Sequence, residues 1–223
     1  MSNRESFCRR LCDKGVVAVV RASSSEQLLE VGRALLAGGV DCIEITMTTP
    51  NALEVISNCR KELGDEALVG VGSTLSADIA RSAIEAGAQF VVSPIFKREI
   101  VEAAHEADLP CVPGAFTPTE VQTAYESGAD IVKVFPGGAV GPKYLKDLLG
   151  PLPHLKLSPT GGVNLDTAAD WIANGACTLG VGSALVTKKA VAGGDMAEIE
   201  RLARQYVDIV ADARAKKEGA DPG

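Results

Sequence analysis

Residues 127–138 read Ser-Gly-Ala-Asp-Ile-Val-Lys-Val-Phe-Pro-Gly-Gly, and the pattern of this stretch decides the fold. Near the start of the stretch is Gly128, a glycine of the kind that ends a helix. An apolar run typical of a buried strand follows, and a Pro-Gly-Gly turn ends the stretch. A small residue, a glycine and a strand recur in the same order around Gly39, Gly87 and Gly175. The recurrence predicts a chain built from repeated strand–helix units.

Apolar runs typical of strands alternate with helical patterns along the whole chain. The expected strands span residues 16–20, 41–46, 68–72, 89–92, 110–113, 130–135, 155–158 and 177–181. Eight such units in a chain of this length predict a (β/α)₈ TIM barrel of the α/β class, with strands buried on both faces. An open doubly wound sheet is the alternative fold, but no GxGxxG motif follows the first strand and no acidic residue is placed to bind a ribose.

The two ends of the chain complete the expected fold. Residues 4–14 predict a short helix that closes the bottom of the barrel. Residues 199–210 carry apolar side chains at helical spacing, which predicts a helix with one face in the core. Residues 213–223 are polar, and we expect this tail to fray. The sequence therefore predicts one domain over residues 1–223, with the barrel over about 15–212.

Two helix starts are marked by a hydroxyl residue followed by proline. Thr49 precedes Pro50 and Thr117 precedes Pro118. Each pair predicts a capping hydroxyl with proline at the first helical position, and Thr117 with Glu120 predicts a capping box.

The composition limits the classes of function. The chain has 223 residues, 46% of them hydrophobic, and a formal net charge of −7. These values suit one domain with a substantial core and argue against a surface for nucleic-acid phosphates. No apolar stretch reaches the length of a membrane span, and the first six residues are not followed by the apolar core of a signal peptide. We expect a cytoplasmic protein without nucleic-acid or membrane partners.

Lys133 lies inside the apolar strand of residues 130–135. Burial of an unpaired ammonium is costly and favours the neutral amine, which is a nucleophile for carbonyl carbons. Period-two alternation places Lys133 and Glu44 on the inward faces of their strands. Together they can form an iminium with a ketone and shuttle a proton through a carboxylate. A buried structural ion pair is the alternative.

The cysteines and histidines argue against a metal. The six cysteines include no Cys-x-x-Cys pair and lie in segments expected to be helix or strand, so we expect reduced structural thiols. His105 and His154 lie beside no cluster of further ligands, whereas a metal-dependent aldolase needs several around a divalent ion. By elimination, the sequence favours covalent lysine chemistry without a metal or cofactor.

Residues at the ends of other strands complete the candidate site, because barrel enzymes take their catalytic groups from there. Arg21 ends the first strand and suits a carboxylate, unless it is simply solvated, and Ser73 offers a hydroxyl to the same pocket. Small residues follow the seventh and eighth strands, at Gly161, Gly162, Gly182 and Ser183. Barrels commonly hold phosphate there on backbone N–H groups, with ordinary turns as the alternative. The pattern suggests an aldolase for a phosphorylated keto acid.

In these motifs the chain resembles the KDPG/KHG aldolases. These class I enzymes split 2-keto-3-deoxy-6-phosphogluconate (KDPG) into pyruvate and glyceraldehyde 3-phosphate. The resemblance runs from about residue 15 to residue 186. It lies in seven motifs that occur in order: Ile43-Glu44-Ile45-Thr46, Gly70-Val71-Gly72-Ser73, Val92-Ser93-Pro94, Val112-Pro113-Gly114, Val132-Lys133-Val134-Phe135-Pro136, Pro159-Thr160-Gly161-Gly162 and Gly182-Ser183.

The resemblance implies a role for each site residue. Lys133 would form the Schiff base, and Glu44 would act as acid and base through a water. Arg21 and Ser73 would bind the pyruvyl carboxylate. Pro94 and Phe135 would shape the pocket, Gly161, Gly162, Gly182 and Ser183 would hold the phosphate, and Thr160 would also contact the substrate. The resemblance also implies a homotrimer.

Two residues depart from common members of the family. Some members carry arginine at the position of Thr48, whereas others place it after the first strand, as Arg21 here. Ser73 stands where threonine is common and keeps the hydroxyl. Carboxylate recognition is therefore expected to depend on Arg21.

The substrate stays open within this class. The loop of residues 135–142 is similar to loops in both phosphogluconate and phosphogalactonate members, so 2-keto-3-deoxy-6-phosphogalactonate and 4-hydroxy-2-oxoglutarate are alternative substrates. A sugar-phosphate isomerase or epimerase barrel would share the phosphate turns without needing an imine. A catalytically silent binding barrel is a third class, which Glu44 and Lys133 disfavour.

Overall fold

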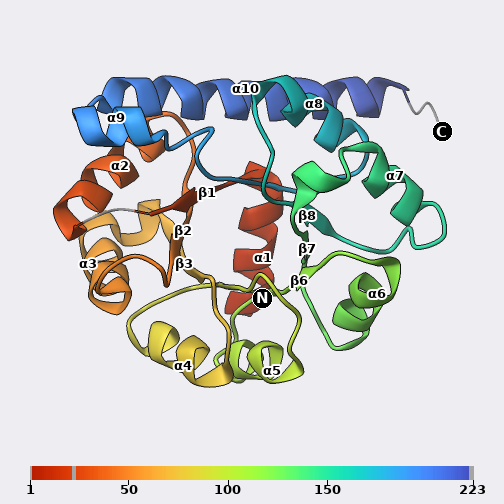
Figure 1. Cartoon of the computed structure of the whole chain (residues 1–223), viewed down its shortest axis with the longest axis horizontal. Helices are drawn as coiled ribbons and strands as arrows, with labels where there is room; N and C mark the ends of the chain where they lie inside the picture. Colours follow the sequence, from red (N-terminus) through yellow and green to blue (C-terminus); the bar gives the residue numbers. More distant parts are fainter. Residues whose placement is uncertain (1, 22–23, 221–223) are drawn as a thin grey trace.

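The structure is a computed structural model, and it describes residues 2–21 and 24–220. Parallel strands alternate with helices and curve around a common centre, with most helices on the outside (Figure 1). The strands are β1 (Val16–Val20), β2 (Cys42–Thr46), β3 (Leu68–Gly72), β4 (Val91–Val92), β5 (Cys111–Val112), β6 (Gly114–Ala115), β7 (Val132–Val134), β8 (Leu157–Pro159) and β9 (Leu179–Val181).

The helices fill the connections between these strands. They are α1 (Asn3–Lys14), α2 (Ser25–Ala37), α3 (Ala52–Leu63), η1 (Gly64–Glu66), α4 (Ala77–Glu85), α5 (Arg98–Glu106), α6 (Pro118–Glu126), η2 (Gly137–Ala139), α7 (Lys143–Leu149), α8 (Leu165–Ala173), α9 (Lys188–Gly193) and α10 (Met196–Ala220). No helix within the described ranges combines the length and the apolar content needed to cross a membrane.

The strands pair in parallel, in a six-stranded sheet ordered β5-β4-β3-β2-β1-β9 and a three-stranded sheet ordered β6-β7-β8. Single bridges between Leu157 and Ala176 and between Thr160 and Gly180 link β8 to the β9 segment. The parallel α/β arrangement confirms the expected fold class. Because connected parallel strands need crossover helices, the helices cover the outer face of the curved sheet.

The strand expected at residues 110–113 is shorter, at Cys111–Val112, and an additional strand that was not predicted follows at Gly114–Ala115. Pro113 separates β5 from β6, and the two halves pair with different neighbours, Cys111 with Val91 and Gly114 with Lys133. Proline has no N–H to donate, so the ladder to β4 cannot continue through it. Its carbonyl instead accepts a hydrogen bond of 2.9 Å from the Lys133 N–H.

The two helix starts predicted from a hydroxyl and a proline have different outcomes. Thr117 caps α6 and forms the capping box with Glu120, as expected. The prediction at Thr49 is wrong, because α3 begins at Ala52 after Asn51, whose φ is 53°. The Thr49 N–H bonds back to the Thr46 carbonyl at 2.9 Å, so residues 46–49 form a turn before the helix begins.

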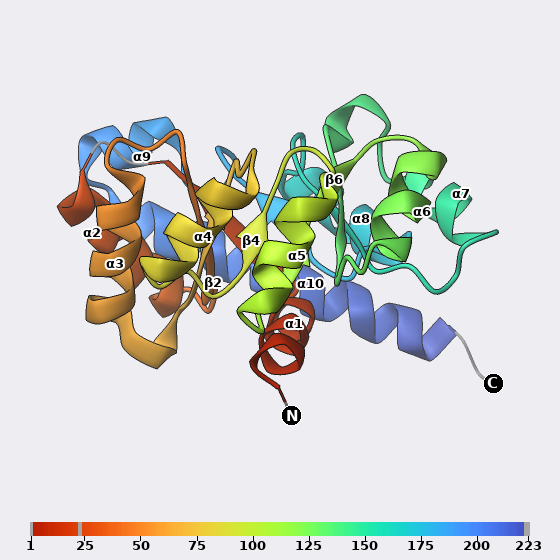
Figure 2. The same ribbon diagram turned by 90° about the horizontal axis from the view of Figure 1, so that it is seen from below.

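Alternating strand residues divide the core into two parts. Outward residues such as Val16 and Val20 pack against the surrounding helices. Inward residues form a second cluster with α1, made of Cys8, Leu11, Val17, Cys42, Leu68, Phe90, Val92, Val112 and Ile131. Gly70 leaves room for the ring of Phe90, since a Cβ there would lie 2.5 Å from ring atoms. In Figure 2 α1 and the N-terminus lie at one side of the strands.

The final helix is longer than expected. In α10 most of the predicted stripe is buried, including Ile199 and Tyr206, while Ile209 is partly buried, and the helix lies across α8 and α2 (Figure 1). The prediction of a frayed tail from residue 213 is wrong as far as Ala220, because α10 continues to that residue, and residues 221–223 lie outside the described part. Arg214 fixes this turn by donating to the carbonyls of Asp13 (2.7 Å) and Cys177 (2.9 Å), contacts that sequence patterns do not reveal.

Candidate active site

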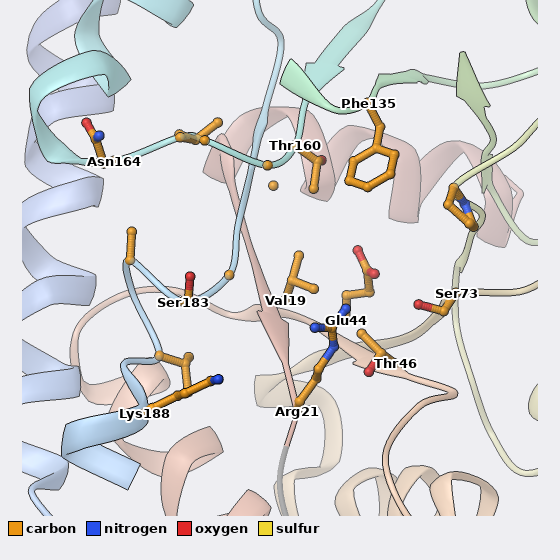
Figure 3. A pocket seen from close by; sticks show the side chains of 18 of the residues that line it. Val19, Arg21, Glu44, Thr46, Ser73, Phe135, Thr160, Asn164, Ser183 and Lys188 are labelled. Carbon is orange, nitrogen blue, oxygen red and sulfur yellow. The ribbon is translucent and has the colours of Figure 1, made fainter. Parts of the chain in front are cut away.

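A cavity of about 730 Å³ lies at the carboxyl ends of the strands (Figure 3). Every site residue predicted from the sequence lines it: Arg21, Glu44, Ser73, Pro94, Lys133, Phe135, Thr160, Gly161, Gly162, Gly182 and Ser183. The structure therefore brings together residues from all parts of the chain at the edge where parallel-strand folds usually bind their ligands.

Lys133 lies at the centre of β7 and its residue is only 6% exposed. Its register partners are Gly114 on β6 and Ser158 on β8. A Cβ at Gly114 would overlap the backbone of Pro94, so the glycine allows β6 to pack closely against the segment that follows β4. The Lys133 Nζ lies 5.2 Å from the centroid of the Phe135 ring, within the range of a cation–π interaction. The amine thus lies beside an aromatic ring that also lines the cavity.

Glu44 lies at the centre of β2, 3% exposed, and its side chain points into the cavity (Figure 3). A Cβ at Gly72 on the neighbouring strand would overlap its carboxylate, so Gly72 makes the space that the carboxylate occupies. Among the ion pairs of the described residues, none joins Glu44 to Lys133. The alternative of a buried structural pair is therefore not what the structure shows.

Polar side chains gather beside Glu44. Figure 3 shows the guanidinium of Arg21 and the hydroxyl of Ser73 directed to the same part of the cavity as the Glu44 carboxylate. Ser73 has a φ of 59°, which is uncommon for a residue with a side chain and is typical of tightly built sites. Thr46 lies nearby, with its hydroxyl 2.8 Å from that of Thr48. This region can bind a carboxylate through a guanidinium and a hydroxyl.

Two glycines after β8 form a turn at the other end of the cavity. Gly161 and Gly162 both have a φ of 80°, a conformation that glycine adopts without strain. Gly137 donates to the Thr160 carbonyl at 2.8 Å, and Gly138 donates to the Gly161 carbonyl at 2.7 Å. Within the described chain, no backbone carbonyl accepts from the N–H groups of Gly161 or Gly162. The turn is held through its carbonyls, and its N–H groups are available for an anion.

The start of α8 and the turn after β9 flank these glycines. Asn164 caps α8 and exchanges hydrogen bonds with Thr167, at 3.0 and 3.1 Å. After β9, the Gly182 carbonyl accepts hydrogen bonds of 2.9 Å from the N–H groups of both Leu185 and Val186. The Ser183 side chain extends into the same region (Figure 3). Backbone N–H groups and a helix N-terminus meet here, which is a common way of binding phosphate.

Sequence reasoning missed several lining residues, of which Lys188 is the most important for charge. It begins α9, and its side chain extends into the cavity (Figure 3). In the sequence, Lys188 and Lys189 resemble an ordinary solvated helix start, and only the way α9 folds back places Lys188 here. The other missed residues are Val19, Gln27, Thr46, Val163, Asn164, Gly180, Ala184, Val186, Val191 and Ala192.

The charges of the cavity favour an anionic ligand. The described lining carries the basic side chains of Arg21, Lys133 and Lys188 and the acidic side chain of Glu44. Cations that line a cleft raise the local concentration of anions. A ligand with two anionic groups would match the Arg21 guanidinium and the N–H groups near Gly162, in a cavity that Lys133 also lines.

A protein-family model described as "KDPG and KHG aldolase" matches residues 8–202 of the chain. Curated relatives agree with it. The chain is 35% identical over 196 residues to a 2-dehydro-3-deoxy-phosphogluconate aldolase of Treponema pallidum, covering 87% of this chain and 93% of the relative. It is 34% identical to the KHG/KDPG aldolase of Escherichia coli K12, covering 93% of this chain and 98% of the relative.

Solved structures are similar over the same length. A structure described as "Native KDPGal structure" has a TM-score of 0.84 and 29% identity, covering 90% of this chain and 96% of the other. A KDPG aldolase from Legionella pneumophila, with pyruvate captured as a covalent carbinolamine intermediate, has a TM-score of 0.80 and 28% identity. This match covers 85% of the chain and 92% of the Legionella protein.

Proposed function

The chain belongs to the KDPG and KHG aldolase family and is a class I carbon–carbon lyase, and from that premise we propose that it cleaves KDPG to pyruvate and glyceraldehyde 3-phosphate. The observation that carries the proposal is that the buried Lys133 lines one cavity together with Glu44, Arg21, Ser73 and the glycine turn after β8. Lys133 is the proposed nucleophile. The relative with a captured pyruvate carbinolamine supports lysine chemistry of this kind.

The proposed reaction begins with binding of the keto acid. Arg21 and Ser73 hold the carboxylate, which places the C2 ketone beside the Lys133 Nζ. The amine attacks C2, the carbinolamine loses water, and a protonated imine results. This cation is an electron sink, so the C3–C4 bond can break with its electron pair moving toward nitrogen.

Glu44 is the proposed acid and base of the cleavage. It takes the proton of the C4 hydroxyl through a water as the C3–C4 bond breaks, and glyceraldehyde 3-phosphate leaves as the aldehyde. The remaining enamine then accepts a proton at C3. Hydrolysis of the pyruvate imine returns the free amine of Lys133.

The phosphate is proposed to bind at the turn after β8 and the turn after β9. The N–H groups of Gly161, Gly162 and Ser183 and the start of α8 would donate to its oxygens, while Gly182 lets the chain approach closely. Thr160, Pro94 and Phe135 would line the path between the amine and the phosphate. Lys188 adds a positive charge to this cavity.

Two further substrates of the same reaction class are alternatives. The similarity to a KDPGal structure favours a test of 2-keto-3-deoxy-6-phosphogalactonate, and the relative named KHG/KDPG aldolase favours a test of 4-hydroxy-2-oxoglutarate. Comparing kcat/KM on the three keto acids decides between them. KDPG is the expected best substrate, and a higher kcat/KM for another would reassign the specificity.

The proposed chemistry is tested by trapping. The protein is incubated with pyruvate and borohydride, which reduces an imine to a stable amine, and the intact mass and the peptide map are then measured. We expect one pyruvate-derived adduct on Lys133, and none in Lys133→Ala. Folded protein without an adduct, or a Lys133→Ala variant with unchanged turnover, would refute the mechanism.

We also infer that the strands form a closed eight-stranded (β/α)₈ barrel with α1 across its lower end. In that description β5 and β6 are one strand interrupted at Pro113. The pairing of β9 with β1, the bridges from β8 to the β9 segment, and the contacts of Leu11 with inward residues support the inference. A crystal structure in which β8 and β9 are separated by another element would refute it.

A homotrimer in the cytoplasm is the proposed state of the protein. Large apolar residues are exposed in loops after β3, β4 and β6, at Leu75, Ile95 and Phe116, and another copy could cover them. The six cysteines are all free thiols, which suits a reducing compartment. Light scattering on the eluted protein should give three times the mass of the chain, and the mass of a single chain would refute the trimer.

A further inference from the structure

A second, much smaller cavity of about 20 Å³ is lined by both Lys133 and Glu44. Its other walls include Leu11 of α1 and the inward residues Phe90 and Ile131, so it lies in the interior on the α1 side of the two reactive groups. The proposed reaction takes place on the other side, in the large cavity. The small cavity is therefore a separate feature of the site.

Three buried hydroxyl residues line the small cavity: Ser158, Thr160 and Thr178. Thr178 is 2% exposed, and its Oγ1 has no hydrogen-bond partner in the described structure. A buried hydroxyl without a partner is unfavourable, because water would otherwise bond to it. In the sequence, Thr178 resembles an ordinary core residue, because it is a single threonine before an apolar strand.

The strands bring these hydroxyls to the level of the amine. Ser158 is the register partner of Lys133. Gly180 lies two residues after Thr178 on the same face, and a Cβ there would overlap the Thr160 hydroxyl. The glycine therefore lets Thr160 extend across the next strand. The polar atoms of three neighbouring strands converge on one small space.

We propose that this space binds one internal water molecule, and that Thr178 holds this water against the Lys133 amine. A water needs roughly 10–15 Å³ and two to four polar partners, and the cavity offers both. The water is a hydrogen-bond partner for the Thr178 hydroxyl and accepts a hydrogen bond from the Lys133 Nζ. Thr178 is thus a positioning residue that acts through the water. This inference rests on the proposed role of Lys133 as the nucleophile.

The water has a consequence for the pH dependence of imine formation. It stabilises the ammonium form of Lys133 by accepting a hydrogen bond, whereas the attack on a ketone needs the neutral amine. The other charged groups that line the two cavities are Glu44 on β2, Arg21 after β1 and Lys188 on α9. All three remain in a Thr178 variant. Loss of the water alone should therefore make the neutral amine accessible at lower pH.

Three matched variants test the inference. Thr178→Val removes the hydroxyl at nearly constant volume, and Thr178→Ser keeps it. Thr49→Val removes another buried hydroxyl without a partner, from a residue that lines neither cavity. The rate of the borohydride-trapped pyruvate adduct is measured against pH, with the melting temperature of each variant as the control for folding. Only Thr178→Val should move the acid limb of the profile, by about one pH unit downward, as expected for one hydrogen bond to a charged group.

A high-resolution crystal structure provides the second arm. We expect one water within hydrogen-bonding distance of the Thr178 Oγ1 and the Lys133 Nζ in the wild type, and no water there in Thr178→Val. Superimposable pH profiles for folded wild type and Thr178→Val would overturn the inference, as would a wild-type cavity without water. A wild type that forms no adduct on Lys133 would instead refute the proposed function, and the crystallographic arm would then decide the water site alone.

Discussion

Replacing Gly72 with alanine should disable the acid–base step and leave the lysine intact. A Cβ at Gly72 would overlap the Glu44 carboxylate, whereas ordinary contact begins at 3.4 Å. The carboxylate must therefore move by about 1 Å or more, and misplacement of that size typically costs about 100-fold in rate. This corresponds to roughly 2.7 kcal/mol of transition-state stabilisation. Gly72 does not have a positive φ, so alanine adds no backbone strain.

The assay separates the two reactive groups. We expect kcat for aldol cleavage by Gly72→Ala to fall about 100-fold, within the range that acid–base catalysis contributes. Trapping of the pyruvate adduct on Lys133 should continue at a rate close to that of the wild type. Gly150→Ala is the control, because a Cβ there would make only contacts of 3.7 Å or longer. Its kcat should not change.

A double-mutant cycle tests whether the effect passes through Glu44. Glu44→Gln alone should lower kcat by a similar factor, because the amide cannot take the proton. If Gly72→Ala acts by displacing the carboxylate, it should cost little more in the Glu44→Gln background. Full additivity of the two losses would refute the reasoning, as would wild-type cleavage by folded Gly72→Ala.

Three other residues lead to separate predictions. Lys188→Met should raise the KM for KDPG about two- to fivefold, as expected for one exposed charge pair. Lys189→Met, which lies outside the cavity, should leave the KM unchanged. Equal effects of the two variants would contradict a role of Lys188 in substrate binding. Arg214→Ala should lower the free energy of unfolding, measured in urea, by about 1–3 kcal/mol, because three backbone carbonyls lose their hydrogen-bond donor. Its kcat/KM should not change, and an unaltered free energy of unfolding would contradict this prediction. Burial raises the pKa of Tyr206 from 10.0 to about 12. The raised pKa stabilises the folded state below pH 10, and this stabilisation is lost as the pH rises toward 12. Tyr206→Phe should therefore lose less stability than the wild type between pH 10 and pH 12, and equal slopes would contradict the assignment.

Local patterns predicted the elements well wherever local physics controls them. The strands β1 and β3 have the bounds expected from apolar runs, and the capping box at Thr117 depends only on neighbouring residues. At Thr49 the same local rule failed, because a turn that closes on the Thr46 carbonyl delays the helix. The extension of α10 was missed because Arg214 is held by carbonyls about 200 and 40 residues away in the sequence.

The candidate site was largely predictable, because strand periodicity determines which side chains share a face and parallel strands have their carboxyl ends at the same edge of the sheet. Lys133, Glu44 and the glycine turns were identified in this way, and they line one cavity. Lys188 and Thr178 were not identified. Neither carries a local signal, since one lies at the exposed start of a short helix and the other precedes a strand.

The sequence by itself determined the strand–helix repeat, the class of reaction and the inward direction of Lys133, because these depend on periodicity and on residue chemistry. Only the tertiary structure decided what surrounds the lysine. The overlap that a Cβ at Gly72 would make with Glu44, the return of Lys188 to the cavity and the gathering of three hydroxyls below Lys133 all join residues on different strands or helices. Such contacts depend on packing between elements that are distant in the chain, which no local pattern encodes.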